Sequence, residues 1–568
     1  MLQLAGAWTA PAPDNRRVLL VNARSEPEQP DPHRLLGIPL GVLTLAQELI
    51  EEGFDPTIID QSVQIDLRDR MRAMPQPAMV GISCDGGEQI IGGREIADAV
   101  RKVWPGVPVV WGGWGPTLQP SIYEHPSAAR WIDIFVRGKG NVAIRQIMRA
   151  FEAERSLDGI DGLTWRDEDG GIHSNPDSPK VVASTRAALP YDLIDWNVYM
   201  TRVGIANYIS ASGCPHRCEF CSIPVSLPTF DPTDNEIVIE HLRDLHSRGI
   251  KYIVFFDDNF FTSKKRVFDL ARRMIESGMN LQWHSNGRVD HLSHVTAEEF
   301  QYLRDSGCNY LNVGLETGDQ AIADGIKKNI VVDDMYEVAR HCERVGIGLT
   351  VNFIIGLPGE TAESQINSFD VLEKLYRIQP KMLVYWHLYM PSPGTPLWKK
   401  HVAEGTLVQP TTLDEMLKFG RYVTEEAGYY SRAPYKIFKI NQDRSQAIAW
   451  YFFIAYVSSV KPGLLSPLGH VLKKWCRWRY DQRHFNFNLD WIAFYWPRRA
   501  KRRVLWARRA LVRRWPRLQN VLFRPKPGYK CHFSLIFDPE WKPEDAAPIG
   551  GSGGAEGMRI VTMTTACD

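Results

Sequence analysis

The sequence predicts an α/β protein with three successive parts: a doubly wound, Rossmann-like parallel sheet, a partial (β/α)6 barrel and a mostly helical C-terminal domain. Two observations support this prediction. Short apolar runs alternate with segments of helical periodicity from Arg17 onward, and a second series of the same kind begins near Gly204. The chain has 568 residues, of which 44% are hydrophobic, so it can form several cores.

The first domain is expected over residues 17–155, behind an N-terminal tail of residues 1–16. Ligands of such parallel sheets bind beyond the carboxyl ends of the strands. Glycine gathers at those ends, where it lets the backbone approach a flat ligand closely. No G-x-G-x-x-G motif opens a helix after the first strand, so a nicotinamide cofactor is not expected. The strands are predicted at Arg17–Asn22, Thr57–Asp60, Met79–Ser83, Val107–Trp111 and Asp133–Val136, and helices at Gly41–Glu52 and Gln89–Val103.

A second domain is expected over residues 204–400, after a linker of residues 156–203. Repeated strand-then-helix units predict a partial barrel, and chemistry is expected at the carboxyl ends of barrel strands. A helix is predicted at Ile237–Leu245, behind the first strand. The strands are predicted at Asn207–Ser210, Lys251–Phe256, Leu281–Asn286, Tyr310–Gly318, Leu349–Glu360 and Met382–Tyr389.

The C-terminal region, residues 401–545, is expected to be mostly helical and to determine substrate identity, with a helix at Leu407–Gly428. The aromatic run Ala447–Val460 is too short to span a bilayer, so a buried helix or an apolar substrate wall is expected. Arg498–Lys530 holds thirteen Lys or Arg and no acidic residue, in a basic amphipathic pattern. This segment is either a solvated face or a contact with an anionic membrane surface or partner. Residues 546–568 are expected to form a flexible tail.

The overall composition gives no sign of a nucleic-acid partner, because the formal net charge is only +1. The N-terminus lacks the basic start and long apolar run of a signal peptide. Six of the nine cysteines are scattered singly, which does not resemble a disulfide framework. We therefore expect a cytoplasmic protein.

Three cysteines, Cys214, Cys218 and Cys221, lie together in a C-x3-C-x2-C segment that follows a short strand. Zinc in a closed site would need a fourth protein ligand, and none lies at a convincing position, although His216 is inside the segment. Three thiolates with one open corner suit an iron–sulfur cluster whose last iron binds something other than protein. A zinc knuckle or ordinary buried cysteines are the alternative. We call residues 213–221 the cysteine loop.

The cysteine loop and the strands behind it resemble the radical S-adenosylmethionine (SAM) superfamily. The first domain resembles the B12-binding domain that precedes the barrel in the cobalamin-dependent branch, which includes methyltransferases. That branch shows Pro-Leu-Gly at the start of its first helix, present here as Pro39–Gly41, and a Gly-Gly-x-x-Pro-Thr loop, which Gly112–Thr117 approximates. Its usual Arg-Gly-Glu-Gly-Glu is altered to Arg137–Asn141, which loses both acids.

This resemblance implies three cofactors: a [4Fe-4S] cluster, SAM and cobalamin. Cys214, Cys218 and Cys221 are expected to hold the cluster. Residues 257–259 are expected at the methionine end of SAM, Glu316 at its ribose and the segment Ile354–Gly359 at its adenine. The expected SAM contacts are Phe220, Asp257, Asp258, Asn259, Glu316, Ile355, Gly356 and Leu357, and the expected cobalamin contacts are Cys84, Asp85, Gly86, Gly112, Gly113, Trp114, Thr117, Gly138 and Gly140.

Several polar residues have no role assigned from the sequence, and no catalytic residue is named. His33 lies in Asp31–Gly37, a loop similar to a cobalt-binding motif, but a solvated loop histidine is the favoured interpretation. Arg288 could steer a carboxylate of SAM or substrate, or only pair with Asp290. For His284 and Tyr389, structural roles are at least as well supported as proton transfer.

The resemblance implies biosynthetic C-methylation of a small or mid-sized metabolite, such as a natural-product or lipid intermediate. A 5′-deoxyadenosyl radical would remove hydrogen, methylcobalamin would carry the methyl group, and flavodoxin or ferredoxin would supply electrons. Methylation of an aromatic carbon could proceed without radical abstraction. The alternatives are a cobalamin-dependent cyclase or ring-rearranging or oxidative enzyme, and a non-catalytic cobalamin or redox sensor. A tRNA methylthiotransferase is disfavoured, because only Cys84 precedes Cys214.

Overall fold

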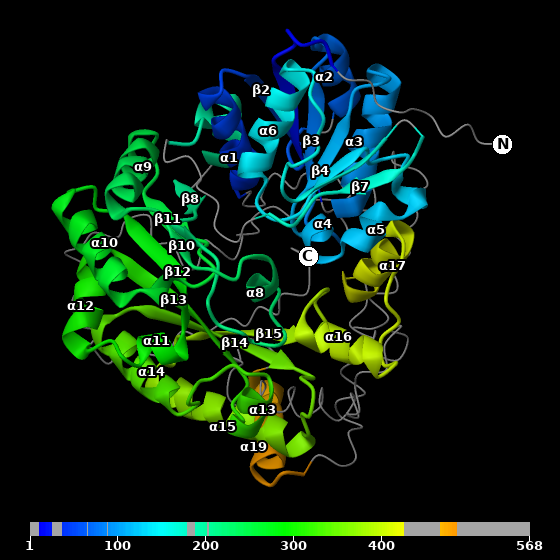
Figure 1. Cartoon of the computed structure of the whole chain (residues 1–568). Coiled ribbons are helices and arrows are strands. Elements are labelled where there is room, and N and C mark those ends of the chain that lie inside the picture. Colours follow the sequence, from blue (N-terminus) through cyan, green and yellow to red (C-terminus); the bar gives the residue numbers. More distant parts are fainter. Residues whose placement is uncertain are drawn as a thin grey trace.

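The computed structural model describes residues 11–24, 37–64, 66–87, 89–167, 169–178, 188–200, 204–424 and 466–484. Two sheets lie one above the other in Figure 1, and helices cover both. Four features considered above lie outside the described residues: the loop with His33, the aromatic run at 447–460, the basic segment at 498–530 and the tail at 546–568.

The N-terminal sheet is built mainly from β1 (Arg17–Asn22), β2 (Asp55–Asp60), β3 (Met79–Ser83), β4 (Val109–Gly112) and β5 (Ile134–Val136), which run parallel. Alternate residues of each strand face opposite cores, so Leu20 packs in one core and Leu19 in another. Helices cover both faces, and the predicted doubly wound fold is confirmed. These helices are α1 (Leu40–Glu51) and α6 (Gly140–Glu152) on one face, and α2 (Leu67–Ala73) and α3 (Gln89–Val103) on the other.

Residues 156–203, expected as a linker, add two strands to this sheet. β6 (Leu163–Arg166) pairs antiparallel with β5, and β7 (Ile172–Ser174) pairs antiparallel with β6. Buried Leu163 and Trp165 attach this hairpin to the core, which a solvated linker would not do. The order is therefore β2-β1-β3-β4-β5-β6-β7, and α7 (Trp196–Met200) leads on to the second sheet.

The second sheet has six parallel strands in the order β15-β14-β13-β12-β11-β8, which confirms the partial barrel. β8 and β15 remain at opposite edges, so the carboxyl ends of all six strands meet along one open rim. The strands are β8 (Ile205–Tyr208), β11 (Tyr252–Phe255), β12 (Gln282–Arg288), β13 (Cys308–Glu316), β14 (Gly348–Ile355) and β15 (Leu383–Leu388). The helices between them are α9 (Asn235–Ser247), α10 (Lys264–Glu276), α11 (Val289–Leu292), α12 (Ala297–Asp305), α13 (Gln320–Gly325), α14 (Asp334–Val345) and α15 (Ala362–Ile378).

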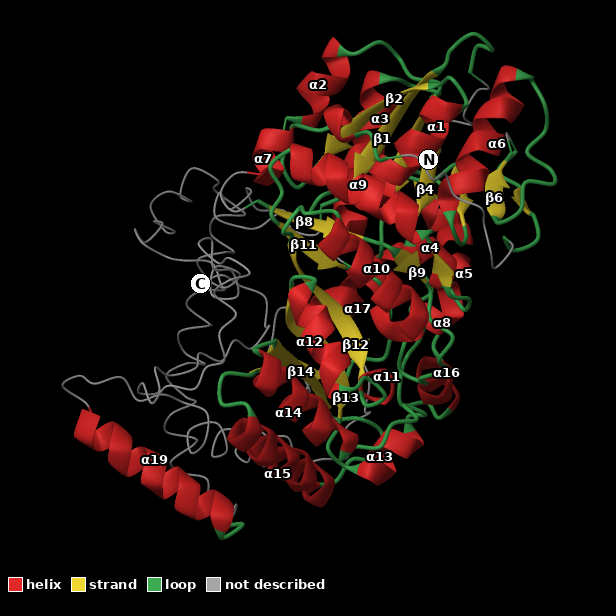
Figure 2. Ribbon diagram, turned by 90° about the vertical axis from the view of Figure 1, so that its left-hand side faces the viewer, coloured by secondary structure: helices red, strands yellow, loops and turns green. Residues whose placement is uncertain are grey.

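The described part of the C-terminal region is helical, as expected. It comprises α16 (Pro396–Ala403), α17 (Leu413–Thr424) and α19 (Ser466–Asp481). α17 contacts the first domain, where Asp414 pairs with Arg94 at 2.6 Å, whereas α19 lies beside the barrel and the Tyr480 hydroxyl donates to Asp370 at 2.9 Å (Figure 2). No helix among the described residues combines the length and the apolar character needed to cross a membrane.

Candidate active site between the two sheets

The cysteine loop is held by a short strand pair at the end of β8. β9 (Ala211–Ser212) pairs antiparallel with β10 (Asp231–Pro232), and the amide of Cys214 donates to the carbonyl of Leu227 at 3.2 Å. Gly213 has φ +81°, and a Cβ there would lie 2.0 Å from the carbonyl oxygen of Thr229. Only glycine fits this position without strain, so the local backbone directs the chain into the loop.

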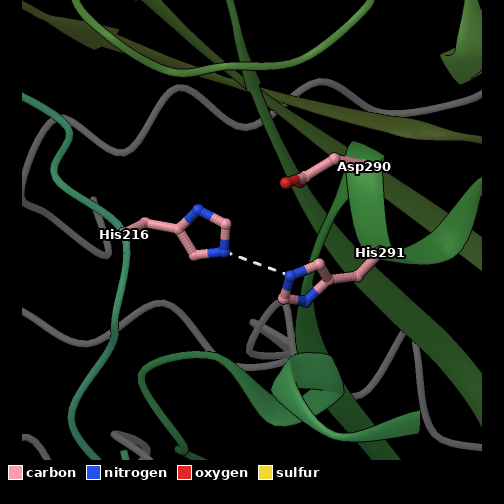
Figure 3. A group of neighbouring side chains, drawn as sticks. All are labelled: His216, Asp290 and His291. Carbon is pink, nitrogen blue, oxygen red and sulfur yellow. Dashed lines mark hydrogen bonds between the residues drawn. The ribbon is translucent and has the colours of Figure 1, made fainter. Parts of the chain in front are cut away.

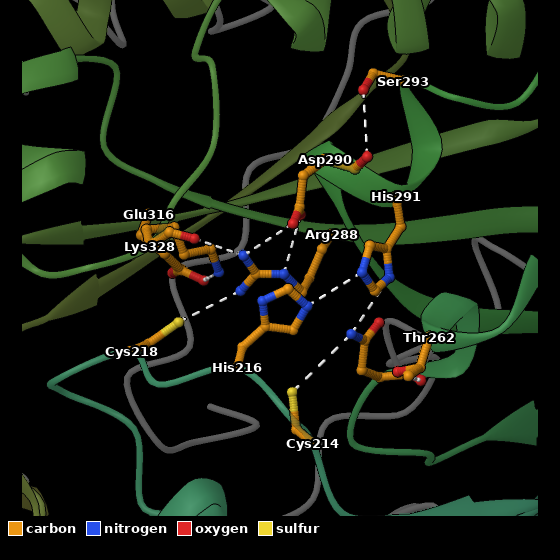
Figure 4. Close-up of polar contacts among 11 residues, drawn as sticks. Cys214, His216, Cys218, Thr262, Arg288, Asp290, His291, Ser293, Glu316 and Lys328 are labelled. Carbon is orange, nitrogen blue, oxygen red and sulfur yellow. Dashed lines mark hydrogen bonds and ion pairs between the residues drawn. The ribbon is translucent and has the colours of Figure 1, made fainter. Parts of the chain in front are cut away.

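None of the three loop cysteines forms a disulfide, and polar side chains from the barrel rim reach two of them. Arg288 Nη1 donates to Cys218 Sγ at 3.3 Å, and Asn259 Nδ2 lies 4.0 Å from Cys214 Sγ (Figure 4). Burial raises the pKa of the Cys214 thiol and raises that of Cys221 to about 11. A coordinating metal would offset this burial, because thiolates are its ligands.

The distances between the three thiols bear on whether they would bind a single zinc ion or an iron–sulfur cluster. Zinc bound by three thiolates would bring the sulfurs within about 4 Å of one another. Among the described residues, the one group of three potential ligands with atoms within 4.8 Å of one another is His216, Asp290 and His291, not the cysteines. Thiolates that bind different irons of a larger cluster stand further apart. Among the described residues, the three sulfurs are therefore not gathered as a closed zinc site would hold them.

His216 contacts His291 instead of a cysteine. Their Nε2 atoms are 3.1 Å apart (Figure 3), and His291 Nδ1 lies 3.4 Å from Asn259 Nδ2. Burial and the nearby Arg288 lower the pKa of His216 to about 4, so this imidazole is neutral at pH 7. Arg288 pairs with Asp290 at 3.0 Å, as one of the two sequence interpretations expected.

The three residues after β11, expected together at SAM, point in different directions. Asp257 is fully buried and accepts from the Ser210 amide and hydroxyl, each at 2.6 Å; burial raises its pKa to about 6. Asp258 accepts from the Gly213 amide at 2.7 Å. Of the three, only Asn259 contacts a loop cysteine through its side chain.

Glu316 ends β13 in a left-handed conformation, with φ +69°. Its carboxylate accepts from Lys328 Nζ at 2.9 Å, and both side chains are almost fully buried. Lys328 Nζ also lies 5.8 Å from the centroid of the Phe220 ring. The pair places a buried charge of each sign close to the cysteine loop (Figure 4). Lys328 was not predicted from the sequence, because nothing in its local pattern distinguishes it from neighbouring Lys327.

The end of β14 combines a turn with an apolar cluster. Ile355 closes the strand, and Gly356 follows with φ +87° and donates its amide to the buried Glu360 carboxylate. Leu357 packs in one cluster with Phe220 and Tyr389. Phe220 immediately precedes Cys221, so this apolar cluster borders the cysteine loop, and Tyr389 is part of the cluster. His284 lies deeper in the barrel, where burial lowers its pKa to about 4.

A cavity of about 530 Å³ lies between the two domains, and we call it the interdomain cavity. Its first-domain side is built from strand ends with Gly112, Gly113, Gly138 and Gly140, which we call the glycine wall. Its barrel side includes Ile209 and Phe256, whose side chains are 44% and 52% exposed although they lie inside the molecule. A flat, partly apolar ligand placed between these two surfaces would cover both of them, which is the arrangement expected for a corrin ring.

Seven of the nine residues expected at cobalamin line this cavity: Asp85, Gly112, Gly113, Trp114, Thr117, Gly138 and Gly140. The other two, Cys84 and Gly86, are not among the lining residues. Cys84 is fully buried in the core of the first domain, and burial raises its thiol pKa to about 12. The carbonyl of Cys84 instead restricts Gly113, where a Cβ would lie 2.6 Å away.

Two family models match the chain, the B12 binding domain over residues 34–148 and the radical SAM superfamily over residues 208–372. The chain therefore combines a B12-binding domain with a radical SAM domain, as cobalamin-dependent radical SAM enzymes do. The predicted family, enzyme class and cofactors are confirmed: a [4Fe-4S] cluster, SAM and cobalamin. Which side chains contact each cofactor stays a prediction.

The proteins similar to this chain differ in how much of their own length aligns with it. An uncharacterized methyltransferase of Pyrococcus horikoshii is 28% identical over 411 residues, which cover 70% of this chain and 87% of that protein. The anaerobic magnesium-protoporphyrin IX monomethyl ester cyclase of Cereibacter sphaeroides is 28% identical over 287 residues, 48% of this chain and 45% of that protein. Among solved structures, the radical SAM methyltransferase TsrM from Kitasatospora setae, with cobalamin and a [4Fe-4S] cluster bound, superposes with a TM-score of 0.59. The match is 21% identical and covers 70% of this chain and 76% of that chain, so it shows the fold alone.

Proposed function

We propose that this enzyme is a C-methyltransferase that acts on a small or mid-sized metabolite. One observation carries the proposal: the interdomain cavity and the cysteine loop share a wall. Asp258 lines the cavity and also accepts from the amide of Gly213, the residue before Cys214. A cobalamin in the cavity and a cluster on the loop would therefore lie close enough to act on one substrate.

The residues around the loop support binding and orientation of a charged cofactor. When bound, the cluster supplies an electron to SAM, and cobalamin supplies a methyl carrier. Asn259 contributes an amide beside Cys214, which suits the ammonium or carboxylate of an amino acid. The Lys328–Glu316 pair offers both a donor and an acceptor of opposite charge, whose mutual contact fixes their positions before a ligand arrives.

Methyl transfer is favoured over ring formation by the extent of the match. The Pyrococcus methyltransferase aligns over 87% of its length, whereas the cyclase aligns over 45% of its length. The aligned part of this chain thus accounts for most of the methyltransferase and about half of the cyclase. Cyclisation or another ring rearrangement remains the second candidate, because identity to the two relatives is equal.

The deciding experiment follows the methyl group of SAM. The full chain, reconstituted anaerobically with iron, sulfide and reduced cobalamin, is incubated with SAM that carries a labelled methyl group. A methyltransferase forms S-adenosylhomocysteine and transfers label to cobalamin even before a substrate is known. Deoxyadenosine formation without S-adenosylhomocysteine would instead support the cyclase-type alternative, and a sensor would form neither product.

The substrate is then sought by transfer of the same label. Candidate metabolites are added singly with a chemical reductant or with flavodoxin, and labelled carbon-bound methyl groups are detected by mass spectrometry. Protein without cobalamin is the matched control, because it should retain deoxyadenosine formation but lose methyl transfer. Equal methyl transfer with and without cobalamin would contradict the proposed role of the interdomain cavity.

A further inference from the structure

Lys139 forms an ion pair that joins the two domains across the interdomain cavity. It occupies the position where the related motif usually has its first glutamate. Its Nζ lies 2.6 Å from Asp231 Oδ2, and the two side chains are 17% and 28% exposed. Both residues line the cavity. The second altered position, Asn141, does not take part, because its amide donates to the buried Glu48 at 3.2 Å.

On the first-domain side, Lys139 belongs to the glycine wall. It immediately precedes α6 and follows Gly138, whose amide donates to the Thr117 hydroxyl at 3.0 Å. That hydroxyl donates in turn to the carbonyl of Gly113 at 2.8 Å. A ligand that seats against these glycines would therefore fix the backbone from which the Lys139 side chain extends.

On the barrel side, Asp231 belongs to the strand that holds the cysteine loop. In the β9–β10 pair it stands opposite Ser212, two residues before Cys214. Residues on both sides of Asp231 also bond to the chain around the cysteine loop. The carbonyl of Leu227 accepts from the Cys214 amide, and the Thr233 amide donates to the carbonyl of Ser210 at 3.0 Å. A shift of Asp231 would therefore be transmitted to the start of the cysteine loop.

A second carboxylate of the cavity wall, that of Asp258, also depends on the charge of Lys139. Asp258 lines the same cavity and supports Gly213. Burial raises the pKa of Asp258, while the Gly213 amide and the positive charge of Lys139 oppose that rise. Lys139 therefore acts on two carboxylates of this wall, on Asp231 through the ion pair and on Asp258 through its charge.

We propose that Lys139 is a positioning residue that couples the cobalamin site to the cysteine loop, so that cobalamin in the interdomain cavity increases affinity for SAM at the loop. The inference rests on the proposed placement of cobalamin in this cavity. Coupling between two binding sites is reciprocal and is commonly about 5- to 150-fold in affinity. Lys139 is thus argued to act through Asp231 on the loop, and not on the reacting atoms.

The test measures binding, not turnover. Cluster-reconstituted full-length protein is dialysed against labelled SAM, with and without saturating hydroxocobalamin, which SAM does not methylate in its oxidised state. For the wild-type protein we expect hydroxocobalamin to lower the SAM dissociation constant at least about fivefold. We call the ratio of the SAM dissociation constants without and with hydroxocobalamin the factor. In Lys139→Met and in Asp231→Asn the factor should fall to about one. Each variant should still bind hydroxocobalamin, as measured by absorbance, and keep its cluster, as measured by iron content.

Charge reversal provides the decisive rescue. Lys139→Glu should abolish the factor, and combining it with Asp231→Lys should restore it, because the pair is re-formed with opposite polarity. Lys264→Met, which removes a lysine that pairs with Glu299 at 2.6 Å on the outer surface, is the matched control and should keep the wild-type factor.

Each other outcome overturns the inference. An unchanged factor in both single variants shows that Lys139 does not couple the sites. A wild-type factor of one shows that no coupling exists. Loss of hydroxocobalamin binding in Lys139→Met, with the cluster intact, makes Lys139 a cobalamin contact and not a positioning residue. Wild-type protein that binds no cobalamin at all contradicts the proposed function itself, which is a different failure.

Discussion

The two sides of the active site, the glycine wall and the cysteine-loop side, present different chemical groups to their ligands. The glycine wall presents mainly backbone, with Gly113 and Gly138 both at positive φ, and it faces apolar Ile209 and Phe256 across the cavity. The cysteine-loop side presents charged side chains, among them Arg288. A corrin ring is recognised by close backbone approach and shape. A cluster and an amino-acid cofactor are recognised by charge and directed hydrogen bonds.

This difference explains why the charged groups near the loop occur in pairs. Arg288 contacts Asp290, Lys328 contacts Glu316, and Asp257 lies 4.0 Å from Arg266. An isolated buried charge would cost several kcal/mol, whereas a partner of opposite sign offsets that cost and holds the side chain in place. Backbone in a glycine wall needs no such partner. Apart from the Lys139–Asp231 pair that joins them, the two sides should therefore fail in different ways.

The largest expected effect comes from breaking the cysteine-loop side alone. Cys214→Ala removes one of three thiolates, so the cluster should be lost and deoxyadenosine formation should fall to background. Cobalamin binding should remain, because the glycine wall is untouched. Iron and sulfide content, product chromatography and cobalamin absorbance measure the three quantities. Cys342→Ala, a buried cysteine of α14, is the control that should keep its cluster. Retention of a full cluster in Cys214→Ala would disprove the assignment.

The next effect compares one glycine from each side. A Cβ at Gly213 would lie 2.0 Å from the carbonyl oxygen of Thr229, and one at Gly113 would lie 2.6 Å from that of Cys84, and both residues have positive φ. Alanine at either position should lower the free energy of unfolding by at least about 1–3 kcal/mol. Gly213→Ala should also reduce cluster content, whereas Gly113→Ala should reduce cobalamin affinity.

Gly112→Ala separates backbone strain from ligand fit in that comparison. A Cβ at Gly112 would meet no protein atom within 4 Å, yet it would enter the interdomain cavity. Cobalamin affinity should therefore fall while the urea midpoint stays within error of wild type. Loss of cobalamin with retention of the cluster in Gly213→Ala would contradict the assignment of Gly213 to the cysteine-loop side.

The sequence predicts much of this architecture because local patterns determine it. Gln89–Val103 forms a helix with the predicted bounds, and the cysteine loop and glycine wall follow strands at predicted positions. The hairpin β6–β7 was missed, because its attachment depends on pairing with β5, far away in sequence. Long-range pairing leaves little trace in local composition, since short strands and linkers use similar residues.

The directions of individual side chains were equally hard to predict. Asp257, Asp258 and Asn259 are adjacent in sequence but contact Ser210, Gly213 and Cys214 respectively. The chain turns at residues 258 and 259, just beyond the end of β11, so the three successive side chains point to different sides. The pair Lys328–Glu316 likewise depends on a turn that folds back onto its own strand end.

A smaller effect is expected from the charge on the cysteine-loop side. Arg288 donates to Cys218 Sγ at 3.3 Å, and hydrogen bonds to cluster sulfurs stabilise the reduced, more negative state. Arg288→Met should lower the cluster midpoint potential by about 60 mV, a tenfold change in equilibrium constant for one electron. An EPR redox titration measures it. Because Asp290 loses its partner, Arg288→Met with Asp290→Asn is the matched control, and an unchanged potential in both proteins would contradict the role of this contact.

The last prediction concerns a buried acid whose effect on stability depends on pH and disappears toward pH 4.5. Glu360 is 8% exposed beneath the end of β14, and burial raises its pKa from 4.5 to about 7. The folded state therefore binds the proton more tightly than the unfolded state, so the stability that Glu360 contributes is present below pH 4.5 and is lost as pH rises toward 7. Glu360→Gln keeps an acceptor for the Gly356 amide without the charge. It should exceed wild type in unfolding free energy by up to about 3 kcal/mol at pH 8, with the difference shrinking toward pH 4.5.

Urea midpoints between pH 5 and 8 test this expectation, and exposed Glu363→Gln on α15 is the control that should show no such trend. Parallel curves for Glu360→Gln and wild type would contradict the raised pKa. SAM affinity adds a second comparison, since Gly356 lies in the segment expected to meet adenine. If affinity is retained in Glu360→Gln, the hydrogen bond and not the charge positions this turn. The cysteine-loop side would then depend on charge near the cluster but on backbone geometry near adenine. In the second respect it would resemble the glycine wall, which depends on backbone geometry throughout.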